Sequence, residues 1–427
     1  MQGKRNSFTL PGYSLLYVLF LLTMLAMILA GLITFRFFSR RQSLEWMGRA
    51  ETERNVQSAF TLLRDPTYVF PEGQAVALSL FDGVNDSVTL CRIRWGFFDL
   101  LKVSARYKNI TFSRMALCGN YHHGEKETAM LLGSSSKPLC LCGNTFLKGI
   151  FHVPMAGVKA ANVGGKFYQR KLLVDGEIDA ADRILPNINP RYLRLQPKDF
   201  LQDYSSFSRI IRLNTGTFND TLVNSFSEPT VILYACEIIT LKRCVLKGNV
   251  MVLSDSVIRV ESTAHITDVI LCAKKIFIEP RFKGAGQFIA TDTLICGHSC
   301  TFPVPSVLAV INKAVYPAPF IFFDKQCRVE GTVLAWSAGP VKPCTAIGII
   351  SEDSRIVGSL YTNREISLNG EVHGNVITQG FILQNPVAIY QNYLIDAVVD
   401  YSRQPDYFAG IAYQETNAFL KIIKWLQ

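Results

Sequence analysis

Apolar residues are distributed along the chain in three ways, and each predicts a different kind of structure. The segment from Asn6 to Phe35 contains no Asp, Glu, Lys, Arg or His, and most of its residues are apolar. A helix needs about 20 such residues to cross the hydrocarbon core of a bilayer. A cleavable secretory signal has a shorter apolar region of about 7 to 15 residues. The segment therefore predicts a retained single membrane span.

A second pattern follows the span and predicts that its helix continues. Apolar residues recur at intervals typical of one helix face, with charged residues between them. These residues are Leu44, Met47, Val56, Phe60 and Leu63. Pro11 suits the first turn of a helix, whereas Asp65-Pro66 is expected to end one. We predict one continuous helix over residues 8–65, with one half in the membrane and an amphipathic half outside it.

The third pattern consists of short apolar runs separated by turn residues, and it predicts β-structure. Residues 67–135 show partial alternation of apolar and polar positions, with Asp82-Gly83 as a turn signal. We expect an antiparallel strand region there. From residue 138 to residue 385, short apolar runs lie beside glycines, and a polar or helical insertion near 187–208 interrupts them.

Within this last region the apolar runs repeat at a nearly constant interval. Similar runs begin at Asn249, Asp268, Gly286 and Pro305, which gives steps of 19, 18 and 19 residues. Two short strands per step fit one coil of a parallel β-helix (β-solenoid), in which each coil buries its inner face against its neighbours. The alignment predicts two core columns, which are Met251, Ile270, Phe288 and Val307, and Leu253, Cys272, Ala290 and Ala309.

The C-terminal residues 386–427 return to helix-like spacing. Tyr393 to Tyr401 and Thr416 to Leu426 place apolar residues at helical intervals. A helix here would cap the open end of the β-helix and shield its edge from other chains. The predicted fold is mainly β, with a long N-terminal α-helix followed by a parallel β-helix (β-solenoid) domain and a helical C-terminal cap.

The start of the chain, KRNSFTLPGYSLLYVLF, resembles the N-terminus of type IV pilins and pseudopilins. The resemblance implies a short leader, residues 1–7, that is cut at Ser7, so that Phe8 becomes the methylated N-terminus. It also implies that the remainder of the chain lies outside the cytoplasmic membrane. Gly12 stands where the family usually has an acidic residue, and Pro11 is atypical of the family. Residues 327–336, 354–363 and 366–381 resemble segments of bactofilins and other polymer-forming β-helices.

Charge and cysteine content narrow the functional classes. The formal net charge is +10, and residues 1–50 carry +5 of it, which leaves +5 for the other 377 residues. The basic excess therefore flanks the predicted span, as expected for contact with membrane lipid, and nucleic acid is not an expected partner. The eleven cysteines lie mostly in apolar runs, so we interpret them as buried small residues. This interpretation fits a reducing compartment better than an oxidising one.

Cysteine and histidine residues supply the strongest candidate metal set, which is Cys118, His122, His123, Cys140 and Cys142. The C-x-C spacing is tighter than that of a structural zinc site, and no second C-x-x-C accompanies it. Buried cysteines and surface histidines are the simpler interpretation. We expect no metal site.

Other chemical motifs are weaker. Cys296 and Cys300 bracket a histidine but fall at strand positions, where stacking explains them. Asp255, Lys274 and Asp292 alternate in charge, which fits a surface ladder better than the acid cluster of a polysaccharide-cleaving enzyme. The sequence contains no P-loop, nucleophile elbow, dinucleotide fingerprint or zinc-protease motif. We expect no catalytic or cofactor site.

These features favour a membrane-anchored structural protein, either a pilin-like minor subunit or an envelope scaffold, that presents a β-helix ectodomain to protein partners. The partners would be pilus or secretion-system subunits, or further copies of the chain. One alternative is a membrane-tethered β-helix enzyme that processes polysaccharide. A second alternative is a bactofilin-like scaffold that faces the cytoplasm, as the basic residues Arg36, Arg40 and Arg41 after the span would allow.

Overall fold

A computed structural model describes residues 12–65, 67–68, 70–80, 86–121, 128–181, 183–204, 208–213, 216–314, 318–340, 342, 344–414 and 419–426. The predicted leader, with Ser7 and Phe8, lies outside these residues. The described chain is mainly β with one long N-terminal helix, as predicted. It divides into two compact units, the first made of Met1–Phe60, Ala77–Leu90 and Val103–Ser113, and the second of Thr61–Val76, Cys91–Lys102 and Arg114–Gln427.

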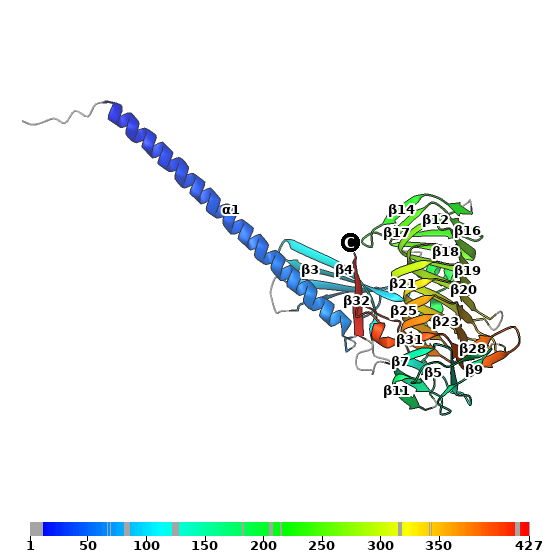
Figure 1. The fold of residues 1–427 in the computed structure, drawn as a ribbon. Helices are drawn as coiled ribbons and strands as arrows, with labels where there is room; N and C mark the ends of the chain where they lie inside the picture. Colours follow the sequence, from blue (N-terminus) through cyan, green and yellow to red (C-terminus); the bar gives the residue numbers. More distant parts are fainter. Residues whose placement is uncertain are drawn as a thin grey trace, which may run out of the picture. The chain divides into compact units, whose positions relative to one another are not determined.

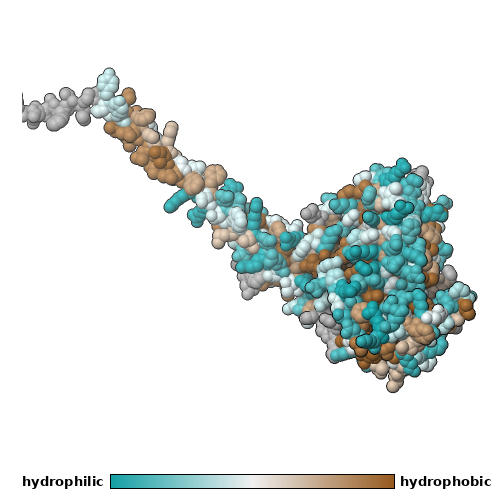
Figure 2. Space-filling view, in the orientation of Figure 1, coloured by the Kyte–Doolittle hydropathy of each residue, from teal (hydrophilic) through white to brown (hydrophobic). Residues whose placement is uncertain are grey.

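Helix α1 (Gly12–Arg64) supplies most of the first unit (Figure 1). It ends directly before Asp65-Pro66, as predicted, because proline lacks the backbone N–H that would continue the hydrogen-bond ladder. The side chains from Tyr13 to Met47, except that of Ser14, are exposed, and Figure 2 shows a largely apolar surface along this half of the helix. The helix is long and apolar enough to cross a membrane.

The second half of α1 is amphipathic. Thr52, Val56 and Ala59 are fully buried along one face, and Phe60 and Leu63 continue that face. Within the first unit, a Cβ on Gly48 would lie 2.5 Å from Ile110 Cδ1, so glycine permits close packing there. The predicted buried stripe is confirmed at Val56, Phe60 and Leu63 but not at Leu44 and Met47, which are exposed.

Five strands form one sheet in the order β1-β2-β3-β4-β32. Their bounds are β1 (Ala75–Leu78), β2 (Asp86–Trp95), β3 (Phe98–Tyr107), β4 (Ile110–Tyr121) and β32 (Phe419–Leu426). Strand β32 pairs antiparallel with β4, with Leu426 opposite Met115 and Phe419 opposite Tyr121. Strands β5 to β31 all lie between β4 and β32 in the sequence, so a large β-region is inserted between two neighbouring strands of this sheet.

Parallel strands stacked in layers make up this inserted β-region (Figure 1). One continuous series of parallel pairings runs β11-β7-β5-β27-β25-β23-β21-β20-β19-β18-β15-β12. Their bounds are β5 (Thr128–Leu132), β7 (Phe146–Val153), β11 (Asp175–Ala180), β12 (Ser208–Arg212), β15 (Thr230–Ala235), β18 (Val250–Val260), β19 (His265–Ile278), β20 (Ala285–Cys296), β21 (Thr301–Asn312), β23 (Arg328–Ser337), β25 (Arg355–Thr362) and β27 (Glu371–Thr378).

Shorter strands complete the layers or flank them. The ones that complete the layers are β13 (Thr217–Phe218), β14 (Thr221–Asn224), β16 (Ile239–Leu241), β17 (Val245–Gly248), β22 (Phe320–Phe323), β24 (Gly348–Ile350), β26 (Glu365–Leu368), β28 (Gly380–Gln384), β29 (Ile389–Gln391) and β31 (Val398–Asp400). A separate sheet has the order β30-β6-β8, from β6 (Leu139–Cys142), β8 (Val158–Ala160) and β30 (Tyr393–Ile395). Strands β9 (Asn162–Val163) and β10 (Lys166–Phe167) form an antiparallel ribbon. Strand β5 belongs to the parallel layers although it falls in the stretch 67–135 that was expected to be antiparallel.

The predicted helical cap over 386–427 is wrong for the residues that the structure describes. Tyr393–Ile395, Val398–Asp400 and Phe419–Leu426 are strands, and only η2 (Tyr401–Arg403) is a short 3-10 helix. The physical reason is that part of this segment is itself a strand inside the layers, because β31 pairs with both β27 and β7 and so lies between them. The periodicity of a short apolar run does not distinguish a helix from a strand, so the strands available for pairing determine its structure.

The core columns differ from the prediction by one residue in one layer. Met251 pairs with Ile270 and Leu253 with Cys272, as predicted, but the next partners are Gln287 and Ile289 rather than Phe288 and Ala290. Asp268 has a φ of +60° at a register shift between Thr267 and Val269, which shortens the step. Because successive strand residues face opposite sides, Phe288 belongs to the other face.

Both faces of these strands are buried. One face forms the interior core, with Val252, Leu271, Phe288 and Leu308 in register. The opposite face, which includes Met251 and Ile270, packs against the insertion η1 (Pro190–Arg194) and α2 (Pro197–Tyr204) in a second apolar cluster. Strands that are buried on both sides have nearly continuous apolar sequences, so their alternation is weak.

A column of glycines lies in the strands beside the candidate site. Gly331, Gly358 and Gly374 stack in register and have φ values of +153°, +138° and +149°. A Cβ on Gly374 would lie 1.9 Å from the carbonyl oxygen of Gly358, and one on Gly358 would lie 2.2 Å from that of Gly331. Only glycine fits this backbone conformation and this close approach.

Candidate functional site

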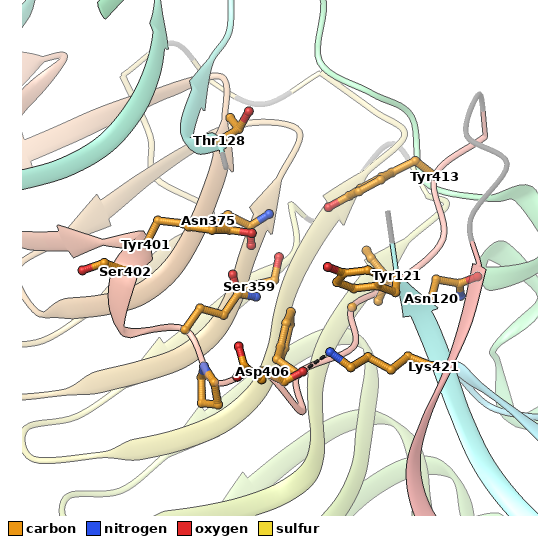
Figure 3. Close-up of a pocket in the computed structure, with 15 residues that line it drawn as sticks. Asn120, Tyr121, Thr128, Ser359, Asn375, Tyr401, Ser402, Asp406, Tyr413 and Lys421 are labelled. Carbon is orange, nitrogen blue, oxygen red and sulfur yellow. Dashed lines mark hydrogen bonds between the residues drawn. The ribbon is translucent and has the colours of Figure 1, made fainter. Parts of the chain in front are cut away.

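A cavity with a volume of about 520 Å³ lies in the second unit. Figure 3 shows its lining: Tyr401 and Ser402 lie on one side, Asn120, Tyr121 and Lys421 lie on the opposite side, and Ser359 and Asn375 lie between them. The remaining lining residues are Thr128, Gln404, Pro405, Asp406, Phe408, Gly410, Ile411 and Tyr413. The lining is therefore dominated by amides, hydroxyls and aromatic rings.

The floor of the cavity comes from the glycine column. Ser359 in β25 and Asn375 in β27 are in register with each other and directly follow Gly358 and Gly374. The next residues, Leu360 and Val376, belong to the interior core, so alternation along the strands places Ser359 and Asn375 on the opposite face. Ser359 is 2% exposed and Asn375 is half-buried.

One wall is fixed by the end of β4. Asn120 N–H donates to the Gly410 carbonyl oxygen at 3.1 Å, and Gly410 N–H donates to the Asn120 carbonyl oxygen at 2.8 Å. The Lys421 ammonium lies 4.6 Å from the centre of the Tyr121 ring and donates to the Asp406 carbonyl oxygen (Figure 3). Burial lowers the pKa of Lys421, and nearby Arg64 lowers it further, while Asp406 opposes them.

The opposite wall is the turn at residues 400–404. Asp400 is almost fully buried and caps η2, because its Oδ1 accepts from Ser402 N–H at 3.0 Å and from Ser402 Oγ at 2.6 Å. The same carboxylate pairs with Arg403 through Oδ2 at 3.0 Å. These bonds hold the backbone of Tyr401 and Ser402 at the cavity edge and leave their side chains on its surface.

Four buried polar atoms in this lining have no hydrogen-bond partner among the described residues. They are Asn120 Nδ2, Ser359 Oγ, Asn375 Oδ1 and Gln404 Oε1. Leaving a buried donor or acceptor unsatisfied costs about 1–3 kcal/mol for each group. Folded proteins seldom keep such groups without water or a ligand to satisfy them. Because four of them lie in one cavity, we take this cavity as the candidate functional site.

Thr128, at the cavity edge, also begins a short polar chain. Its Oγ1 lies 3.4 Å from His152 Nε2, and His152 Nδ1 lies 3.0 Å from Asp179 Oδ2. The order hydroxyl, imidazole, carboxylate is that of an activated nucleophile. Arg183 donates to the same Asp179 oxygen at 2.5 Å, and the contacts with Arg183 and His152 lower the pKa of Asp179.

The structure does not bring the predicted candidate residues together at this cavity. Cys118 lies in β4 and Cys140 and Cys142 in β6, all three buried, and burial raises the thiol pKa to about 12 for Cys118 and about 11 for Cys142. His122 and His123 lie outside the described residues. In the part of the chain that is described, no three His, Cys, Asp or Glu side chains are arranged to hold a metal ion.

The other predicted groups also have local partners. Cys296 and Cys300 are buried thiols, and burial raises the pKa of Cys296. Asp255 accepts from the Tyr234 hydroxyl at 2.6 Å, and Asp292 lies 3.7 Å from the Lys275 ammonium. The residues that line the cavity were missed by sequence analysis. The one available signal was the recurrence of glycine followed by Thr332, Ser359 or Asn375.

Comparisons with known proteins add little to this description. No protein-family model matches the chain, and no curated protein matches it. The crystal structure of the competence-associated pilin ComZ from Thermus thermophilus aligns with 84% of this chain and 87% of that chain, at 10% sequence identity and a TM-score of 0.21. A TM-score this low supports no conclusion about fold or function.

Proposed function

We propose that the chain is a membrane-anchored structural and assembly protein that acts through binding rather than catalysis. The observation that carries this proposal is the N-terminal half of α1, where apolar side chains from Tyr13 to Phe38 are exposed. Exposing so much apolar surface to water is strongly unfavourable, whereas a bilayer core accepts it without cost. Lipid is therefore the proposed partner of this half of the helix.

The proposed form of the inserted β-region is a β-solenoid. Support comes from the long series of parallel pairings, in which each strand is in register with the strand of the next layer. Each layer buries its inner face only against its neighbours, which gives a stiff body with a long surface. Such a body suits the presentation of a binding surface to pilus or secretion-system subunits, or to other copies of the chain.

The proposed pilin-like maturation involves cleavage after residue 7 and methylation of Phe8. The supporting features are the basic residues Lys4 and Arg5 and the start of the apolar segment directly after them. Mass spectrometry of the N-terminal peptide from membranes tests this. A methylated N-terminus at Phe8 is expected, while a mature chain that retains Met1 would remove the pilin-like version and leave an anchored scaffold.

The proposed orientation places the C-terminal part outside the cytoplasm. The structure offers a natural reporter, because Cys236 is exposed, Cys91 and Cys344 are partly exposed, and the other eight cysteines are buried. A membrane-impermeant maleimide applied to intact spheroplasts is expected to label the native chain and to label a Cys236→Ser variant much less. Labelling of Cys236 only after the cells are lysed would instead favour the cytoplasm-facing scaffold.

A second candidate function is hydrolysis of acyl esters on polysaccharide, and it depends on the chain Thr128, His152 and Asp179. His152 would take the Thr128 proton as the hydroxyl attacks the ester carbonyl, and would give it to the sugar alcohol as the ester C–O bond breaks. His152 would then take a proton from water, which attacks the acyl-threonine, releases the carboxylic acid and restores the Thr128 hydroxyl. Hydrolysis of p-nitrophenyl acetate by the native protein, with loss in His152→Gln and gain in Thr128→Ser, would support it. Equal rates in all three proteins would leave only the binding function.

A further inference from the structure

We infer that the cavity between η2 and the end of β4 binds a neutral oligosaccharide segment. The inference depends on the four buried polar atoms without partners and on the rings and hydroxyls around them. It does not depend on the membrane anchor. It also does not depend on catalysis at Thr128, because the four atoms belong to other residues.

The unpaired atoms match the chemistry of a hydroxyl-rich ligand. Ser359 Oγ can both donate and accept, Asn120 Nδ2 donates, and Asn375 Oδ1 accepts. A sugar hydroxyl also donates and accepts at once, so neighbouring hydroxyls on one ring satisfy this mixed set. Ser359 is 2% exposed and Asn120 is 5% exposed, so a hydrogen bond from either side chain to a ligand would be shielded from bulk solvent.

The shape and the aromatic content of the cavity favour a sugar ring over a small ion. Its volume of about 520 Å³ is in the range of sites that hold organic ligands. Tyr121, Tyr401 and Tyr413 line it, and Figure 3 shows Tyr121 and Tyr413 on the same side, above Lys421. Tyrosine rings offer an apolar face to the C–H groups of a sugar and a hydroxyl to its oxygens.

The charge of the lining argues against an anionic ligand. Lys421 is the sole cation among the described residues that line the cavity, and its ammonium already contacts the Tyr121 ring and the Asp406 carbonyl oxygen. The negative charge of the Asp406 carboxylate raises the pKa of Lys421 and so opposes the effect of burial. A cavity lined by one ammonium group, one carboxylate and many neutral polar groups favours a neutral ligand over a phosphate or a uronic acid.

The test uses the full chain in detergent micelles and a panel of neutral tri- to hexasaccharides of glucose, galactose, mannose and N-acetylglucosamine. Isothermal titration and saturation-transfer NMR are expected to detect saturable binding of at least one of them. Ser359→Ala and Asn120→Leu are each expected to weaken that binding at least tenfold. Both variants should keep or raise the melting temperature, because each removes a polar group that has no partner in the free protein.

A matched control separates binding from folding. Ser354 is also buried, at 1% exposure, but its Oγ donates to the Asp324 carbonyl oxygen at 2.8 Å and accepts from Cys327 N–H at 3.1 Å. Ser354→Ala is expected to lower the melting temperature and to leave saccharide affinity unchanged. The inference is overturned if no oligosaccharide in the panel binds, if only acidic saccharides bind, or if Ser359→Ala and Asn120→Leu bind as the native chain does.

Discussion

The N-terminal half of α1 and the parallel strands contain the same apolar residue types but expose them very differently. Leu21 in α1 is 63% exposed, whereas Leu271 in β19 is fully buried. The helix satisfies its backbone hydrogen bonds internally, so it can present apolar side chains to lipid. The strands require neighbouring layers for both their hydrogen bonds and their core. Apolar composition therefore predicts that a segment is removed from water. Whether lipid or other strands surround it depends on whether its backbone hydrogen bonds are made within the segment or with neighbouring strands.

This difference has an energetic consequence. A change in the exposed half of α1 should alter membrane association and leave the folding of the strands intact. A substitution in one strand of the layers should destabilise the strands on both sides of it, because each strand is paired in register with the strand before it and the strand after it. Substitutions in the two regions can therefore be compared by whether they affect unfolding or membrane partition.

The largest effect is expected from Gly374→Ala in the glycine column. The new Cβ would overlap the Gly358 carbonyl oxygen at 1.9 Å, and alanine disfavours a φ of +149°. We expect a loss of more than about 4 kcal/mol in the free energy of unfolding, with little folded protein recovered. Urea unfolding of the full chain in detergent, followed by circular dichroism, measures this loss.

Gly157→Ala is the matched control for the glycine column. Gly157 also has a positive φ, of +71°, but a Cβ there would meet nothing within 4 Å. Its expected cost is about 1–2 kcal/mol, from backbone strain alone. Equal losses in the two variants would show that the close approach of the layers does not determine the requirement for glycine at residue 374.

Phe288→Ala should have the next largest effect. Phe288 is fully buried, and its ring lies 6.0 Å from that of Phe282 and 5.4 Å from that of Phe302. Removing it from a packed core should cost about 3–5 kcal/mol in the free energy of unfolding. Ala290→Gly tests the same strand with little loss of volume. A smaller loss in Phe288→Ala than in Ala290→Gly would contradict the observed packing of Phe288 in the interior core.

These positions show which parts of the fold could be predicted from the sequence alone. Helix α1 was predictable because its signals are local: a long run without charge and a proline after Arg64. The register of β20 was not, because it depends on the positive φ of Asp268, and a one-residue shift moves Phe288 between faces. Gln287 takes the predicted place of Phe288, where its side-chain amide bonds to Phe97 N–H at 2.7 Å and to the Trp95 carbonyl oxygen at 2.9 Å.

The cavity could not be predicted for a similar reason. Its lining residues come from three stretches of the sequence, with Asn120 and Thr128 in the first, Ser359 and Asn375 in the second and Lys421 in the third. They meet through the pairings of β4 with β32, of β25 with β27 and of β27 with β5. Each of these residues is an ordinary polar residue in its local segment. The information that defines the site is the pairing of strands separated by hundreds of residues, which no local pattern encodes.

Leu25→Arg should have a smaller effect than the core substitutions, and on a different quantity. Leu25 is exposed near the middle of the apolar half of α1, so a charge there should cost about 2.5–3.5 kcal/mol on insertion into a membrane. We expect more of the protein in the soluble fraction after membrane sedimentation. The urea midpoint of the strands should not change. A lowered midpoint with normal sedimentation would contradict the separation between the two regions.

His373→Gln should have the smallest effect, and it should depend on pH. Burial lowers the pKa of His373, Arg355 and Arg403 lower it further, and Glu371 and Asp400 oppose them. Above the unfolded pKa of about 6.5 the imidazole is neutral in both states, so it adds no pH dependence. As the pH falls below that value, the unfolded chain binds a proton that the folded chain does not, and the free energy of unfolding decreases until the lower folded pKa is reached. Between about pH 7.5 and 5, the free energy of unfolding in urea should therefore decrease less in His373→Gln than in the native chain. Equal decreases would mean that protonation of His373 does not affect the stability of the strands.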